Sequence, residues 1–176
     1  HFFAFAVDGQ IFYAENMDTV GENMIEVSPT VVIAVPRFFE KIYAKIMNGL
    51  QTASPTKVKL FNWALKVGKD YTNIIHAKHN PSLLLTLKYR LADSVIYSKV
   101  RKKLGGKIKF FISGGAPLSP DIAEFFAGIG VTILEGYGLT ETSPVLTSNT
   151  PDKIRFGYVG TSLYNVDIKI ANDGEI

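Results

Sequence analysis

A single strand–helix–strand pattern constrains the fold of this chain more than any other feature. Apolar strands are predicted at 107–113 and 131–138. Between them, Ser119 and Pro120 suit an N-cap and a first helical position, and the predicted helix ends at Gly130. Strands joined through one helix pair in parallel by a right-handed crossover. The pattern therefore predicts an α/β fold with a parallel sheet.

Further strands and helices are predicted upstream of this pattern. The β-branched run at 30–35 predicts a strand that is buried on both faces. Pro36 then opens a helix at 37–50. The core face of this helix is expected on Phe39, Tyr43, Ile46 and Leu50. Shorter elements expected before them are a strand at 9–14 and a helix at 18–27 with Asp18 as its N-cap.

Residues 54–104 contain no convincing strand and are expected to form a helical insertion. Ser54-Pro55 and Asn80-Pro81 are both typical of an N-cap followed by a first helical residue. They predict helices over 55–76 and 81–104. The predicted architecture is a doubly wound parallel sheet over 1–150 with this insertion. The start of a β-rich subdomain is expected at 151–176.

Composition limits the classes of partner. Hydrophobic residues make up 47% of the chain, which argues against disorder, and a net charge of +3 is too small to indicate a nucleic-acid partner. The absence of cysteine excludes disulfides and thiolate metal sites and fits a cytoplasmic protein. A basic stretch at 99–109 has three readings: a solvated face, contact with phosphates, or peripheral contact with an anionic membrane.

Two loops are expected at the edge where ligands bind in open α/β sheets, at 113–119 and 136–144. Gly114 and Gly115 would let a planar ligand approach the backbone, although a tight turn also favours glycine. Tyr137 could stack on an aromatic base, or it could be a core tyrosine.

The segment "GLTETSP" gathers hydroxyls around one carboxylate. The Thr140 hydroxyl could bind a phosphate and Glu141 could hold Mg²⁺, whereas the alternative is a capped helix N-terminus. Taken together, the two loops describe a nucleotide site. His76 and His79 are spaced like metal ligands but have no third ligand nearby.

The segments "FFISGGAPLSPDIAEFF" and "ILEGYGLTETSPV" resemble the AMP-forming acyl-CoA synthetases of the adenylate-forming superfamily. "PTVVIAVPRFFEKIYAKI" and "LADSVIYSKVRKKLGGKIKFFISGGAPL" narrow the resemblance to the long-chain fatty-acid–CoA ligase branch, with its helical insertion. The resemblance covers nearly the whole chain and implies part of the large N-terminal domain of such an enzyme.

The resemblance implies activation of a fatty acid by ATP with Mg²⁺, followed by thioester formation with coenzyme A. Thr140 would contact the α-phosphate and Glu141 would ligate Mg²⁺, and these two are the expected catalytic residues. The resemblance also assigns the nucleotide-binding residues. Gly114, Gly115 and Ala116 would line adenine, Tyr137 would stack on it, and Gly136 and Gly138 would lie beside the activated carbonyl.

Two alternatives stay open at this stage. One is an adenylation enzyme for another carboxylate, and the other is a non-catalytic binding module that keeps the fold. The chain begins without Met and ends in "NDGEI", so we interpret it as an internal fragment and expect it to be inactive alone. The sequence does not indicate an oligomeric state.

Overall fold

A computed structural model describes residues 8–176 of the protein. All its strands lie in one sheet, in the order of the sequence. The strands are β1 (Val31–Ala34), β2 (Phe110–Ser113), β3 (Ile133–Gly138), β4 (Val145–Ser148) and β5 (Thr161–Ser162). β1, β2 and β3 are parallel, whereas β4 and β5 continue the sheet antiparallel. The predicted α/β fold is confirmed, and the β3–β4 hairpin is an addition that the sequence analysis did not predict.

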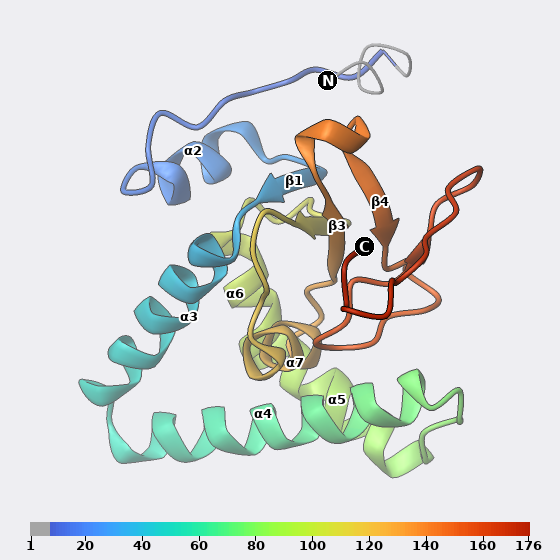
Figure 1. Cartoon of the computed structure of the whole chain (residues 1–176). Helices are drawn as coiled ribbons and strands as arrows, with labels where there is room; N and C mark the ends of the chain where they lie inside the picture. Colours follow the sequence, from blue (N-terminus) through green and yellow to red (C-terminus); the bar gives the residue numbers. More distant parts are fainter. Residues whose placement is uncertain (1–7) are drawn as a thin grey trace.

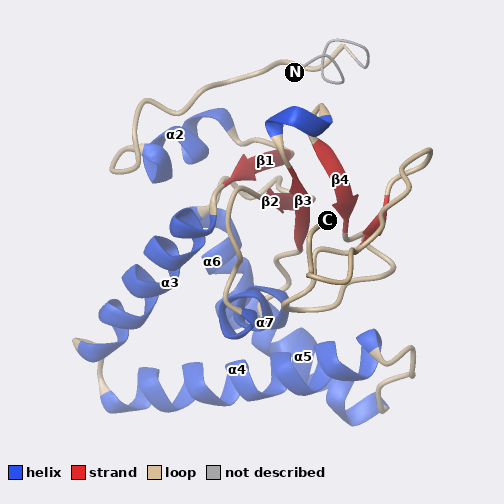
Figure 2. Ribbon diagram, in the orientation of Figure 1, coloured by secondary structure: helices blue, strands red, loops and turns tan. Residues whose placement is uncertain are grey.

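The long helices lie on one side of the sheet, and the turn of the β3–β4 hairpin lies at the opposite end of the molecule (Figure 1, Figure 2). The α-helices are α2 (Val20–Val27), α3 (Pro36–Gln51), α4 (Pro55–His76), α5 (Leu83–Ala92), α6 (Ser98–Lys103) and α7 (Pro120–Gly128). A π-helical turn (Asp93–Tyr97) joins α5 to α6, and a 3-10 turn, η2 (Thr140–Thr142), follows β3. None of the helices in residues 8–176 has the length and apolarity needed to cross a bilayer.

The core lies between the sheet and α3, α4 and α7. Phe39 is fully buried, and its ring centroid lies 5.5 Å from that of Phe111 and 5.8 Å from that of Phe126. The predicted core face of α3 continues through Tyr43, which packs edge-on against Phe125. Phe38 is also buried, so α3 buries a wider face at its start than its spacing predicted.

The prediction that β1 is buried on both faces is wrong for the described structure. Ile33 is 75% exposed and Val31 is 40% exposed, whereas Val32 and Ala34 face the core. β1 pairs only with β2 and therefore forms the edge of the described sheet. Both crossovers place their helices on one face, and the opposite face of β1 has no helix over it among residues 8–176.

The upstream predictions need two corrections. Residues 9–14 form no strand, because they pair with no other strand in the described part of the chain. Asp18 does not cap α2, whose N-cap residue is Thr19. Asp18 instead forms an ion pair with Lys41 of α3, which links the two helices.

The helical insertion is confirmed, but its second helix starts later than predicted. Ser82, not Asn80, is the N-cap residue, and its Oγ accepts a hydrogen bond of 3.2 Å from the backbone N–H of Leu85. A serine with extended backbone provides this acceptor directly before the first helical residue. Pro81 therefore lies before the helix rather than at its first position.

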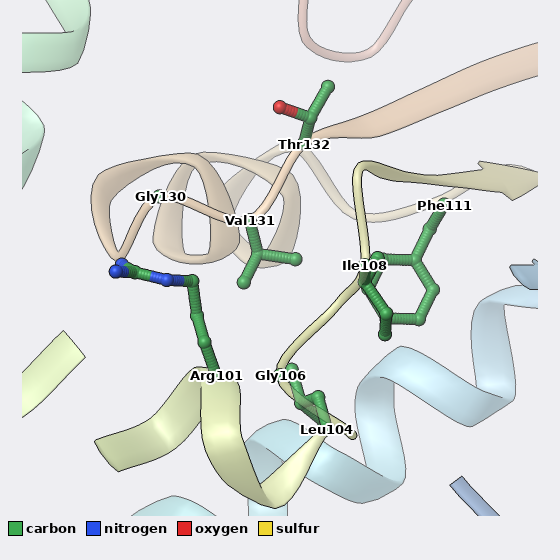
Figure 3. Close-up of a pocket in the computed structure, with 8 residues that line it drawn as sticks. All are labelled: Arg101, Leu104, Gly106, Ile108, Phe111, Gly130, Val131 and Thr132. Carbon is green, nitrogen blue, oxygen red and sulfur yellow. The ribbon is translucent and has the colours of Figure 1, made fainter. Parts of the chain in front are cut away.

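The end of the insertion is fixed to the turn before β3 by one basic side chain, Arg101, which points toward the Gly130 turn in Figure 3. Arg101 Nη1 lies 2.7 Å from Asp93 Oδ1 and donates to the carbonyl of Ile129 at 3.0 Å. Asp93 belongs to the π-helical turn between α5 and α6, whereas Ile129 lies in the turn between α7 and β3, beside Gly130 with its φ of 74°. The basic stretch at 99–109 is therefore not uniform, because Arg101 is a structural residue with both a carboxylate and a carbonyl partner.

Candidate functional site

The two loops predicted to meet do lie side by side. β2 and β3 are parallel neighbours, and Ser113 pairs with Glu135 at their carboxyl ends. A Cβ atom placed on Gly114 would lie 3.7 Å from the carbonyl oxygen of Gly136. The N–H of Gly114 also donates to the carbonyl of Ala34 at 3.3 Å. The loop therefore starts where the carboxyl ends of all three parallel strands meet.

The glycine loop presents an open ledge of backbone. Gly115 has a φ of 84°, so the turn itself requires glycine there. Gly114 has no such φ, and a side chain there would make only ordinary contact. Gly115 and Ala116 are exposed. The backbone conformation explains why residue 115 is glycine but does not explain glycine at position 114. Close approach of a ligand to the backbone would explain Gly114.

The two glycines that flank Tyr137 have different environments. A Cβ on Gly138 would lie 1.7 Å from the carbonyl oxygen of Pro144, inside a β-bulge of the β3–β4 hairpin. A Cβ on Gly136 would lie 3.2 Å from the carbonyl oxygen of Thr147. The close approach of the hairpin strands therefore accounts for Gly138 without any ligand.

Tyr137 lies at the end of β3, opposite Thr147 of β4. Its side chain is partly exposed and is not among the residues that form or border the described hydrophobic core. It also makes no ring–ring contact with another aromatic residue in residues 8–176. The described packing thus gives no support to the alternative of a core tyrosine.

The hydroxyls of "GLTETSP" divide into structural and free groups. Thr142 Oγ1 accepts from the N–H of Leu139 at 3.1 Å and lies 2.9 Å from the carbonyl oxygens of Leu139 and Pro144, so it closes the hairpin turn. Thr140 and Glu141 are exposed, and their side chains have no hydrogen bond or ion pair within the described structure. The turn is a short 3-10 segment rather than the start of an α-helix, and it presents the free Thr140 hydroxyl and Glu141 carboxylate. The hydroxyl of the exposed Ser143, directly after the turn, also has no hydrogen bond in the described structure.

This donor set is compatible with a magnesium ion that shares its coordination with phosphate. No group of three or more His, Asp or Glu residues in residues 8–176 could hold a metal alone. Mg²⁺ keeps several waters and needs only one or two carboxylates when phosphates supply the other oxygens. A single exposed carboxylate such as that of Glu141 therefore suits a metal that arrives with a nucleotide.

The sequence analysis missed Glu135, which lies directly before Gly136. This side chain is only 6% exposed, and burial raises the pKa of its carboxyl above the ordinary value of 4.5. The backbone N–H groups of Leu118 and Gly157 lower that pKa in part by hydrogen bonding. A charged residue inside the apolar run "ILEGYG" was the sequence signal that could have revealed it.

A second buried polar residue, Asn149, binds the segment after β4 to the same region. Its N–H donates to the carbonyl of Glu135 at 2.8 Å, and its Nδ2 donates to the carbonyl of Tyr158 at 2.7 Å. Arg155 lies over the ring of Tyr158, with 3.8 Å between the guanidinium carbon and the ring centroid. Asn149 therefore holds the 155–158 turn against the β3–β4 hairpin.

The chain matches known proteins over nearly its full length. The profile of the AMP-binding enzyme family matches residues 2–176. A long-chain-fatty-acid–CoA ligase of Mycobacterium bovis is 37% identical over 148 residues, which cover 84% of this chain and 24% of that protein. Long chain acyl-CoA synthetase 1 of Arabidopsis thaliana is 34% identical over 172 residues, which cover 94% of this chain and 24% of that protein. The chain thus spans about a quarter of the length of these relatives.

Solved structures agree on the fold. An anthranilate CoA ligase in complex with anthranoyl-AMP matches 95% of this chain and 23% of its own, with a TM-score of 0.53 and 16% identity. The adenylation domain of a carboxylate reductase from Mycobacterium chelonae matches 78% of this chain and 17% of its own, with a TM-score of 0.50 and 22% identity. The family match over residues 2–176 shows that the chain belongs to the AMP-binding enzyme family.

Proposed function

We propose that the protein containing this chain is a long-chain fatty-acid–CoA ligase. The observation that carries the proposal is the exposed, unpaired Thr140–Glu141 turn that follows β3, together with the Gly114–Ala116 ledge that follows its parallel neighbour β2. In a member of the AMP-binding family, this arrangement suits a nucleotide whose base lies on the ledge and whose phosphates reach the turn.

The proposed reaction has two steps. An oxygen of the fatty-acid carboxylate attacks the α-phosphorus of ATP, and the bond from that phosphorus to pyrophosphate breaks. The thiol of coenzyme A then attacks the acyl carbonyl, the carbon–oxygen bond to AMP breaks, and the thiol proton leaves to solvent. Each step concentrates negative charge on phosphate oxygens, which hydrogen-bond donors and cations stabilise.

Each predicted site residue has a proposed role in these steps. Gly114, Gly115 and Ala116 line the adenine, and Tyr137 stacks on it. The Thr140 hydroxyl donates to the α-phosphate, and Glu141 ligates Mg²⁺, which supplies charge neutralisation as pyrophosphate leaves. Gly136 lies beside the activated carbonyl. Gly138 has the same proposed place, in addition to its demonstrated contact with Pro144.

The choice of a fatty acid over another carboxylate rests on the relatives. The proteins at 34–37% identity described above carry names of long-chain fatty-acid or acyl-CoA ligases. The helical insertion α4–α6, which the resemblance associates with that branch, is present in the structure.

We also propose that residues 1–150 and 151–176 belong to two structural units. The exposure of most side chains in 151–176 supports this division, although β5 of this segment pairs with β4.

A peripheral membrane contact of a cytoplasmic enzyme is also proposed, on the surface of α5 rather than on the 99–109 stretch. Leu83, Leu87 and Leu91 recur every four residues on one face and are 86%, 62% and 56% exposed. Lys88 and Arg90 lie beside them, and residues 77–92 include no acidic side chain. An apolar stripe bordered by cations fits the surface of an anionic bilayer.

A comparison of two variants of the full-length protein tests the nucleotide site. Glu141→Ala should abolish pyrophosphate release from ATP and a long-chain fatty acid, with an unchanged circular dichroism spectrum. Tyr137→Ala should raise KM for ATP about tenfold to a hundredfold with a smaller change in kcat, because stacking is worth roughly 1–3 kcal/mol in ground and transition states alike. Tyr137→Phe keeps the ring and is the matched control.

Three results would contradict parts of the proposal. Wild-type turnover that requires no fatty acid would exclude the ligase reaction, and nucleotide binding without any turnover would favour the non-catalytic binding module. Tyr137→Phe as damaging as Tyr137→Ala, with the loss in kcat, would exclude the stacking role.

A further inference from the structure

Glu135 is the only charged side chain that is buried in the described part of the chain. It lies on β3 after the apolar pair Ile133 and Leu134, with Ser113 as its neighbour in the parallel pairing. Burying a carboxylate is costly unless hydrogen bonds compensate. The burial of the Glu135 carboxyl therefore requires polar groups nearby that compensate for the loss of water.

Backbone N–H groups from two distant segments lie near this carboxyl group and act to lower its pKa. One is the N–H of Leu118, at the end of the glycine loop, and the other is the N–H of Gly157, in the turn after β4. Neither N–H donates to a backbone carbonyl in the described structure. Leu118 is itself only 2% exposed, so its N–H would lack a partner without Glu135.

The two segments also pack against each other. A Cβ placed on Gly157 would lie 3.0 Å from Cγ of Pro120, the first residue of α7. Gly157 has a φ of 76°, so its conformation strongly disfavours any other residue. The loop, the start of α7 and the 155–158 turn thus meet around one carboxyl group.

We propose that Glu135 is a positioning residue that fixes the distance between the backbone of the Gly114–Ala116 ledge and the ring of Tyr137. It precedes Gly136 and Tyr137 on β3 and holds the far end of the ledge through Leu118. The backbone of the ledge and the ring of Tyr137 therefore keep a fixed separation. This inference rests on the proposed function, in which adenine lies between them.

Substitutions in the full-length protein test the proposal. Glu135→Ala should raise KM for ATP about tenfold, with a smaller change in kcat and an unchanged KM for the fatty acid, because a displaced ledge weakens adenine binding. Glu135→Gln keeps one acceptor oxygen and should recover part of the loss. Ser113→Ala is the matched control, since Ser113 is 2% exposed and its hydroxyl has no partner in the described structure.

A second measurement does not depend on activity. Amide hydrogen exchange at Leu118 and Gly157 should be faster in Glu135→Ala than in wild type, and unchanged in Ser113→Ala. If Glu135→Ala does not fold, Glu135→Asp replaces it, because it keeps the charge but shortens the reach by one methylene. Wild-type KM for ATP and wild-type exchange in the folded variant would overturn the proposal. An inactive wild-type protein with fast exchange in Glu135→Ala would contradict the ligase function and the adenine role but retain the anchoring by Glu135.

Discussion

Gly68 of α4 lies directly against the backbone of Gly128 in α7. A Cβ placed on Gly68 would lie 2.2 Å from the carbonyl oxygen of Gly128 and 2.9 Å from the hydroxyl of Tyr97. The contact is reinforced by an ion pair of 2.7 Å between Lys69 and Glu124 and by the Thr72 hydroxyl, which donates to the carbonyl of Ala127 at 3.3 Å. The helical insertion is therefore packed tightly on the helix that joins β2 to β3.

Gly68→Ala should destabilise the protein by roughly 1–3 kcal/mol, because the added methyl group cannot fit without separating the helices. The measurement is the free energy of unfolding from denaturant titration. Gly49→Ala in α3 is the control, since a Cβ there meets nothing within 4 Å and should be neutral or stabilising. Equal stability of the two variants would show that the α4–α7 contact is looser than described.

Gly138→Ala should disrupt the β3–β4 hairpin, because the new Cβ would overlap the Pro144 carbonyl. We expect lower stability together with loss of both adenylate formation and nucleotide binding. Thr140→Ala is the comparison, since it removes a free exposed hydroxyl from the same turn and should leave stability unchanged. A stable Gly138→Ala variant that binds ATP normally would contradict the structural role of this glycine.

Acidification should weaken the contact between the end of α4 and the 151–156 segment. His76 lies with its ring centroid 5.0 Å from that of Phe156, and burial lowers the pKa of its imidazole below the ordinary 6.5. As the pH falls, the unfolded chain therefore binds a proton at His76 at a higher pH than the folded chain does. The stability that neutral His76 contributes to the fold is present above pH 6.5 and decreases as the pH falls through the folded pKa.

The test of this pH dependence compares wild type with His76→Phe, which keeps the ring contact and removes the titration. The free energy of unfolding of wild type should decrease relative to the variant between neutral pH and pH 5. Parallel pH profiles for the two proteins would show that His76 is not responsible.

The leucine face of α5 should bind anionic vesicles. Leu87→Asp places a charge at the centre of the stripe and should reduce cosedimentation of the full-length protein with vesicles that contain phosphatidylserine. Binding to neutral vesicles should be weak for both proteins, because Lys88 and Arg90 then have no anionic lipid headgroups to attract them. A concentration-dependent dimer that Leu87→Asp abolishes, without vesicle binding, would instead identify a second copy as the occupant.

The order of elements was predictable because β-branched runs and helix caps are local signals. Ser119 and Pro120 correctly marked the start of α7. The identity of the cap on α5 was not predictable, since Asn80 and Ser82 both suit an N-cap and only the packing of the chain decides between them. The exposure of Ile33 depends on which segments cover the sheet, and a run of apolar residues does not contain that information.

The candidate site was predictable in its location but not in its internal roles. The spacing of the strands placed Gly114 beside Gly136. The distinction between Thr140 and Thr142 depends on the hydrogen bonds of the hairpin, and β4 was not anticipated. Glu135 was overlooked because its partners lie 17 residues before it and 22 residues after it in the chain.

The uncovered edge of β1 has a practical consequence for work on this segment. Val31, Ile33 and Val35 present apolar side chains next to backbone groups that no neighbouring strand satisfies on that side in the described structure. Such an edge is a template for strand addition by another chain. Preparations of the 176-residue segment alone should self-associate through this edge at high concentration.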